Sequence, residues 1–94
     1  MISNSFRDRN IEPLKPREIE IAIARELDMT IAEIADWLGL APSTVRNYMN
    51  SARQKCGVKR TEAVYFLARE VYGMISDQDI EDVINSLRDG GFLS

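Results

Sequence analysis

Hydrophobic residues recur along this chain at the three- and four-residue spacing of amphipathic helices. A first helix is predicted to begin after Pro16 and to run to about Leu27. Its apolar face would consist of Ile19, Ala22, Ile23 and Leu27. Thr30 and Glu33 then form a T-x-x-E capping box, which predicts a second, short helix that ends at Gly39.

A third helix is expected to begin at Pro42, because proline suits the first helical position, and to end at Cys56 before Gly57. The residues on its buried stripe would be Val45, Met49, Ala52 and Cys56. A fourth helix should span roughly Arg60 to Tyr72 and stop before a glycine. This spacing predicts two consecutive helices of moderate length after the short one.

The fourth predicted helix carries more hydrophobic surface than one core face needs. The members of one face are Val64, Leu67, Ala68 and Val71. Tyr65, Phe66 and Tyr72 lie on other sides of the same helix. These three aromatic residues are expected either to form a dimer or partner interface or to pack beneath the next helix.

A fifth helix is predicted after Ser76, because Ser76 and Asp79 have the spacing of a helix cap. Its apolar stripe would be Ile80, Val83, Ile84 and Leu87. Gly90 and Gly91 should end it. Residues 1–13 lack periodicity and are interpreted as a flexible N-terminal arm. No segment shows the alternation of a strand, so the fold class is predicted to be all-α.

Composition narrows the function classes. The chain has 94 residues, which suits one small domain, and it contains no histidine, the commonest general base and metal ligand. Its single cysteine, Cys56, cannot form an internal disulfide, as in a reducing cytoplasm. No apolar run approaches the roughly 20 residues that span a bilayer. We therefore expect a cytoplasmic protein that is not an enzyme and needs no cofactor, metal or membrane.

Charge is distributed unevenly along the chain, and this distribution says more about the possible binding partners than the net charge does. The net charge is −3, yet residues 37–61 contain five basic and no acidic residues. Residues 70–94 contain six acidic residues and one basic residue. An acid-free segment between acidic ends is typical of a surface that approaches a polyanion.

The acid-free segment coincides with the layout of a helix-turn-helix. The small residue Ala35 lets the helices on either side of Gly39 approach each other, and the glycine permits the turn. The outward side of the second of these helices, opposite its buried stripe, carries Arg46, Asn47, Asn50 and Arg53. Arginine and asparagine are the residue types that bind guanine and adenine edges with two hydrogen bonds.

Several separated pieces of the chain resemble the LuxR/FixJ-type (GerE-like) helix-turn-helix DNA-binding domain. The pieces are residues 14–20 (LKPREIE), 30–40 (TIAEIADWLGL), 43–49 (STVRNYM), 55–58 (KCGV) and 60–64 (RTEAV). The resemblance implies a four-helix domain over residues 14–73, in which the third helix enters the major groove and the fourth pairs two copies. Residues 74–94 would then be an acidic C-terminal helical extension outside the family pattern.

The resemblance also implies roles for individual positions. The side chains that face base edges would be Arg46, Asn47 and Asn50. Those that hold backbone phosphates would be Thr44, Arg53, Lys55, Lys59 and Arg60. Glu18 resembles an acidic residue in the first helix of the family, which is commonly structural.

Some positions depart from the family pattern. Lys15 and Ala41 replace the usual Thr and Ser caps of the first and third helices, and a missing cap costs about 1 kcal/mol. Asp28 stands where glycine is common, and Tyr48 stands where histidine is usual. Asn50 stands where a basic residue is frequent, which lowers the expected affinity for DNA.

These features predict a small sequence-specific transcription regulator that binds double-stranded DNA as a homodimer, with its recognition helix at about residues 42–56. An alternative is a protein-interaction module that inhibits or modulates a LuxR-type regulator or another partner through the fourth helix and the acidic C-terminal helix. In one variant, that acidic helix lies near the basic segment and lowers DNA affinity. A third interpretation is a promoter-reading helix-turn-helix like that of sigma factors, which share the T-V-R pattern of residues 44–46.

Overall fold

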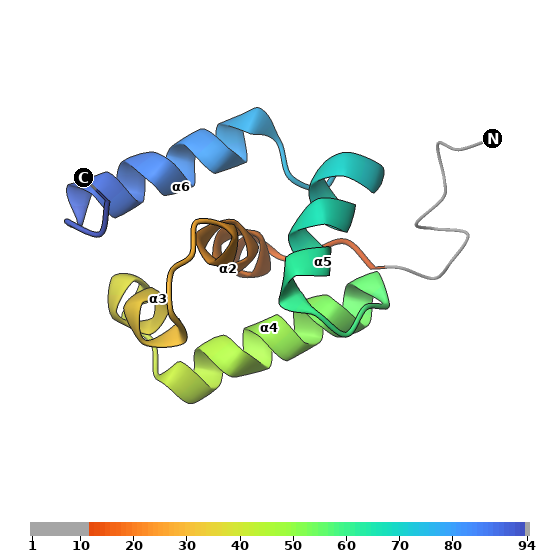
Figure 1. The fold of residues 1–94 in the computed structure, drawn as a ribbon, viewed down its shortest axis with the longest axis horizontal. Coiled ribbons are helices and arrows are strands. Elements are labelled where there is room, and N and C mark those ends of the chain that lie inside the picture. The colour runs from red at the N-terminus through yellow and green to blue at the C-terminus, as the bar shows by residue number, and fades with distance from the viewer. Residues whose placement is uncertain (1–11, 94) are drawn as a thin grey trace.

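The computed structural model describes residues 12–93. Over these residues the chain is helical and has no strand, which confirms the predicted all-α class (Figure 1). The predicted N-terminal arm falls mainly on residues 1–11 and so lies outside the described residues. Between residues 12 and 93, no helix is long and apolar enough to cross a membrane.

Helix α2 (Pro16–Glu26) is central, and the other helices pack around it (Figure 1). The buried hydrophobic residues of this helix are Ile21, Ala22, Ile23 and Ala24. The sequence pattern placed Leu27 on the buried face, but Leu27 is 36% exposed and follows the end of the helix. Because α3, α4, α5 and α6 contact α2 from several sides, consecutive residues of α2 are buried instead of a single stripe.

Helix α3 (Ile31–Leu38) begins and ends at the predicted residues. The hydroxyl of Thr30 accepts a hydrogen bond from the Glu33 N–H at 3.1 Å, and Glu33 Oε1 accepts one from the Thr30 N–H at 2.8 Å. Gly39 ends the helix with a φ of +67°, which glycine adopts without steric cost. Asp28 also has a positive φ, +66°. Glycine adopts this left-handed conformation more easily than other residues, which explains why glycine is common at this position in the family.

Helix α4 (Pro42–Cys56) follows after a short turn. Its N-cap, Ala41, makes no side-chain hydrogen bond to the helix, because the methyl group of alanine has no hydrogen-bond acceptor. Gly57 ends the helix in the left-handed conformation, as predicted. The residues of the predicted stripe are all buried: Val45, Met49, Ala52 and Cys56. This stripe faces the core, and the rest of the surface of α4 is left for other contacts.

The fourth predicted helix has two parts. Helix α5 (Thr61–Phe66) continues as a π-helical segment, η1 (Leu67–Val71), in which the Tyr72 N–H donates to the Leu67 C=O at 2.8 Å. A π turn holds more residues than an α turn, so it rotates later side chains around the helix axis. The prediction that Val71 belongs to the buried face is therefore wrong, since Val71 is 48% exposed. The members of that face that are buried are Val64 and Ala68.

Helix α6 (Asp77–Asp89) begins at the predicted cap, where the hydroxyl of Ser76 accepts a hydrogen bond from the Asp79 N–H at 3.0 Å. Val83 and Leu87 are buried in the same hydrophobic cluster as the residues of α2. A further contact comes from α3, where the indole N–H of Trp37 donates to the Ser86 hydroxyl at 3.0 Å. Two residues of the predicted apolar stripe of α6 are thus buried within this chain, and the other two, Ile80 and Ile84, are half-buried.

The position of α6 relative to α4 determines whether the acidic helix covers the exposed side of α4. Figure 1 shows α6 on one side of α2 and α4 on the other, and α2 contacts both. The acidic helix therefore does not lie against α4, and it meets the acid-free segment at Trp37, at the end of α3. The variant of the alternative hypothesis in which α6 covers the basic segment does not describe this conformation.

Candidate nucleic-acid interface

The side chains predicted to face base edges lie on the outward side of α4. Arg46, Asn47 and Asn50 are all exposed. They are opposite the buried stripe, through which α4 packs against α2, α3 and α5. We refer to Arg46, Asn47, Asn50 and Arg53 as the outward face of α4. The whole face lies in the acid-free segment, so it presents positive charge and amide groups.

Arg53 differs from the other members of this face, because its guanidinium is bonded at two points. Its Nη1 donates to the Thr61 hydroxyl at 2.8 Å. Its Nη2 donates to Oδ1 of Asn50. Thr61 is the first residue of α5, so Arg53 links the outward face of α4 to the next helix. Both partners are neutral, and the positive charge of Arg53 is not compensated by them.

A small hollow lies beside this linked arginine. It has a volume of about 190 Å³. Its lining residues are Ile31, Arg46, Met49, Asn50 and Arg53. Two guanidinium-bearing side chains thus border one concave site. Such a site has the charge that an anionic group of a nucleic acid requires.

The remaining predicted phosphate contacts lie in three different settings. Thr44 is half-buried in the first turn of α4 and borders a hollow of about 240 Å³ together with Asn47. Lys59 and Arg60 are exposed in the connection between α4 and α5. Lys55 is the exception, because its ammonium is turned toward the inside of the domain.

Lys55 forms a shielded ion pair with Glu18. Lys55 Nζ lies 2.9 Å from Glu18 Oε1, and the two side chains are 13% and 1% exposed. The same carboxylate oxygen accepts a hydrogen bond from the Lys15 N–H at 2.7 Å, at the start of α2. This pair joins the end of α4 to the beginning of α2. The ammonium of Lys55 is therefore engaged within the domain, and we do not include it among the proposed phosphate contacts.

The ionisation of two buried groups reflects this arrangement. Burial alone would raise the pKa of the Glu18 carboxyl, but hydrogen bonds from Lys55, the Lys15 N–H and Ser51 outweigh it and lower the pKa below its ordinary value. Burial, and next the negative charge of Glu18, raise the pKa of the Cys56 thiol. The thiol therefore stays protonated at neutral pH, and Cys56 acts as a small buried hydrophobic residue.

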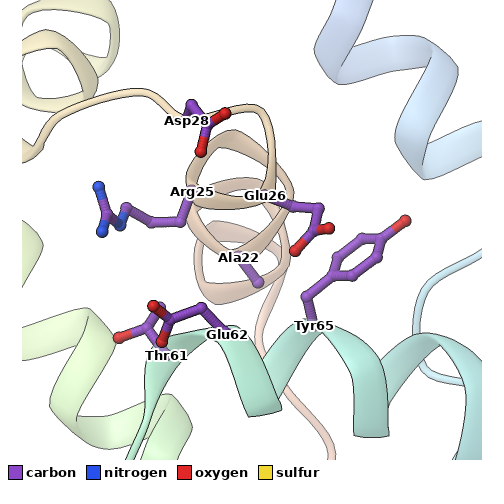
Figure 2. Close-up of a pocket in the computed structure, with 7 residues that line it drawn as sticks. All are labelled: Ala22, Arg25, Glu26, Asp28, Thr61, Glu62 and Tyr65. Atoms are coloured by element: carbon purple, nitrogen blue, oxygen red, sulfur yellow. The ribbon is translucent and has the colours of Figure 1, made fainter.

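A larger hollow, of about 440 Å³, lies between α2 and α5 (Figure 2). Figure 2 shows Arg25 and Glu26 extending from α2 to opposite sides, with Glu26 on the side of Tyr65, while Glu62 and Tyr65 come from α5. The lining includes Asp28 as well, so negative charge predominates. The described residues contain no group of three or more His, Cys, Asp and Glu side chains that could hold a metal ion. This hollow has the wrong charge for a phosphate.

The three residues predicted to form a dimer or partner interface are not equally accessible. Phe66 is 57% exposed, whereas Tyr65 and Tyr72 are half-buried. Val71, which the sequence pattern assigned to the core, adds a second exposed hydrophobic side chain on the same stretch. The interface itself stays a prediction, but its accessible residues are Phe66 and Val71.

Two features of the site were not found from the sequence. The first is Thr61 as the partner of Arg53, and the second is Lys55 as the partner of Glu18. The spacing of 37 residues between Lys55 and Glu18 carries no periodic signal. Thr61 has an ordinary helix-start position, and only the crossing of α4 and α5 brings it to Arg53.

Comparisons with known proteins agree with this geometry. The family model described as "Sigma-70, region 4" matches residues 11–56, which include α2, α3 and α4. Spore germination protein GerE from Bacillus subtilis (strain 168) is 44% identical over 57 residues, which cover 60% of this chain and 77% of GerE. No solved structure matches the chain. The chain belongs to the LuxR/GerE-like family of helix-turn-helix domains, a DNA-binding family of transcription regulation and not an enzyme family.

Proposed function

We propose that this protein is a sequence-specific transcription regulator that places α4 in the major groove of double-stranded DNA and acts as a homodimer. The observation that carries the proposal is the outward face of α4, which is free of carboxylates and on which Arg46, Asn47 and Asn50 are exposed and Arg53 is half-buried. The major groove is about 12 Å wide and admits an α-helix. The cytoplasmic location predicted from the sequence belongs to the same proposal.

Within the groove, Arg46 and Asn47 are the proposed readers of base edges. Both are exposed, and within residues 12–93 neither side chain forms a hydrogen bond or an ion pair. Arginine can donate two hydrogen bonds to guanine, and asparagine can bind adenine through its amide. Asn50 was predicted to act in the same way, but its amide oxygen accepts a hydrogen bond from Arg53.

The proposed phosphate contacts flank this reading surface. Thr44 lies in the first turn of α4, and Arg53 lies nearer its end. Lys59 and Arg60 extend the positive surface into the connection with α5. Contacts of this kind set the register of the helix on the duplex and contribute affinity that does not depend on sequence. They also make binding sensitive to salt.

A selection of bound sequences from a random duplex pool, followed by titration, tests this proposal. Binding to the selected duplex should weaken as salt rises from about 50 to 200 mM, with a log–log slope of about −0.9 for each phosphate contacted. Arg46→Ala should weaken binding. The matched control is Arg88→Ala, which removes an exposed arginine from α6. Absence of binding at low salt, or binding that is insensitive to salt, would refute the proposal.

Pairing of two copies is supported by the exposed hydrophobic side chains Phe66 and Val71. Burying such side chains between two copies contributes roughly 1.5–3 kcal/mol for each side chain that is fully buried. The selected DNA should then contain two inverted half-sites. Phe66→Ser should abolish pairing, as measured by sedimentation equilibrium, and leave the helix content unchanged. A monomeric wild-type chain that occupies single half-sites would contradict the homodimer.

The same exposed residues support the alternative, in which this chain binds a different regulator protein. In that case Phe66 and Val71 would contact the regulator, and DNA selection would fail while the complex with the regulator forms. On the stripe of α6, Val83 and Leu87 are buried within this chain, so only the half-buried Ile80 and Ile84 are left for such a partner.

A further inference from the structure

We infer that Arg53 is a pre-positioned phosphate contact, and that Asn50 and Thr61 are positioning residues that hold its guanidinium. The inference rests on the proposed DNA-binding function and assigns Asn50 a different task from reading a base. Its starting point is the pair of hydrogen bonds from Arg53, to Thr61 at 2.8 Å and to Asn50.

The chemistry of the partners distinguishes Arg53 from the described cations that form ion pairs. Arg17, Lys55 and Arg69 each pair with a carboxylate, so their charges are compensated. Arg53 is held instead by a hydroxyl and an amide oxygen, both neutral. Its direction is therefore restricted while its positive charge stays available. This combination suits a contact with an anion that comes from outside the domain.

The guanidinium keeps donors for such a contact. It has N–H groups on three nitrogen atoms, and the bonds to Thr61 and Asn50 use one N–H of each Nη. The remaining N–H groups lie on a group that also borders the 190 Å³ hollow with Arg46 and Asn50. A phosphodiester at this hollow would meet the Arg53 guanidinium with little further loss of side-chain freedom.

The bond to Arg53 limits what Asn50 can do at a base edge. Arginine has no acceptor, so the amide oxygen of Asn50, and not its NH₂ group, must face Arg53. Bidentate binding of adenine needs both the oxygen and the NH₂ group of the same amide, directed at one base. We therefore assign Asn50 to positioning, and Asn47, whose side chain makes no such bond within the described residues, to base reading.

A double-mutant cycle on the selected duplex tests the assignment. Thr61→Val removes the hydroxyl but keeps the shape, and it should weaken DNA binding about threefold to tenfold, as one lost hydrogen bond does. Thr61→Ser keeps the hydroxyl and should restore binding. In the Arg53→Ala background, which should also flatten the salt dependence by about one phosphate contact, Thr61→Val should have no effect.

The control and the contradicting outcomes are specific. Ser86→Ala removes another hydrogen bond between helices, the one from Trp37, and should leave DNA binding unchanged. Additive effects of Thr61→Val and Arg53→Ala would overturn the role of Thr61. Asn50→Ala should weaken binding to all sequences alike, and a loss confined to one base pair would overturn the role of Asn50. A wild-type chain that does not bind DNA would refute both this inference and the proposed function, whereas additivity refutes the inference alone.

Discussion

Helices α4 and α6 are built alike toward the core and differently toward the outside. Each packs a hydrophobic stripe against α2, and the two lie on opposite sides of it (Figure 1). The outward face of α4 carries arginine and asparagine with no carboxylate. The exposed acidic residues of α6 are Asp77, Glu81, Asp82 and Asp89. Both helices therefore contribute to the core in the same way, and the charge of their exposed side chains makes α4, and not α6, suitable for an approach to DNA.

The comparison also separates two ways of using a helix. The buried residues of α6 belong to the core, and its exposed carboxylates have the charge that repels phosphates. The buried residues of α4 likewise belong to the core, but the opposite side of this helix carries hydrogen-bond donors and acceptors. Changes to the core side of either helix should therefore alter stability, whereas changes to the outer side of α4 alone should alter DNA binding.

The largest effect is expected from the core side of α6. Leu87 has no exposed surface, and Leu87→Ala should lower the free energy of unfolding by about 2–5 kcal/mol, because it leaves a cavity. Urea denaturation measures this change, and Leu27→Ala, at a position that is 36% exposed, should cost much less. Where Leu87→Ala is still folded, its DNA affinity should equal that of the wild type. A specific loss of affinity would show that α6 takes part in binding.

The second effect concerns the ion pair beneath α4. Glu18→Gln removes the charge that Lys55 neutralises and should lower the free energy of unfolding at pH 7 by about 1.5–3 kcal/mol. Because the pKa of Glu18 is lowered on folding, its contribution is complete above pH 4.5 and is lost as the pH falls through the folded pKa. The stability difference between wild type and Glu18→Gln should therefore shrink in acid.

Denaturation curves recorded at several pH values check this dependence. Glu20→Gln is the control, because Glu20 pairs with Arg17 at the surface, where both side chains are more than a third exposed. Exposed pairs contribute about 0–1 kcal/mol. A stability difference for Glu18→Gln that stays constant from neutral pH into acid would mean that the Glu18 carboxylate is not the group that titrates.

Much of this fold could be predicted from the sequence, for local reasons. The caps at Thr30 and Ser76 and the end of α4 at Gly57 depend on neighbouring residues, so short patterns suffice to find them. The buried stripe of α4 was predicted completely because one side of that helix faces the core. Helix α2 was predicted less well, because it is covered from several sides and no single stripe describes it.

What the sequence did not reveal depends on contacts between distant segments or on backbone shifts. The π-helical turn that exposes Val71 has no simple pattern, since its residues would also suit an α-helix. The inward orientation of Lys55 follows from the packing of α4 on α2, which brings Glu18 within reach. Charge counting could identify the basic segment but could not distinguish its compensated lysine from its available arginines.

The third effect lies on the outer side of α4. Asn47→Ala should reduce discrimination at one base pair by about 1–3 kcal/mol, because one amide then no longer binds one base edge. Titration against duplexes that vary at single positions measures it. Asn85→Ala, which removes an exposed asparagine from α6, is the matched control and should change no affinity. Equal weakening at every base pair after Asn47→Ala would mean that Asn47 contacts the backbone and not a base.

The smallest expected effect comes from the N-cap residues, in which α4 and α6 differ. The N-cap of α6 is Ser76, whose hydroxyl accepts a hydrogen bond from the N–H of Asp79, whereas the N-cap of α4 is Ala41, which cannot accept one. Ser76→Ala should therefore destabilise the domain by about 1 kcal/mol, and Ala41→Ser should stabilise it by about the same amount. Thermal denaturation resolves both changes. If Ala41→Ser brought no gain, the N–H groups in the first turn of α4 would already be satisfied by water, and the difference between the two caps would carry no cost.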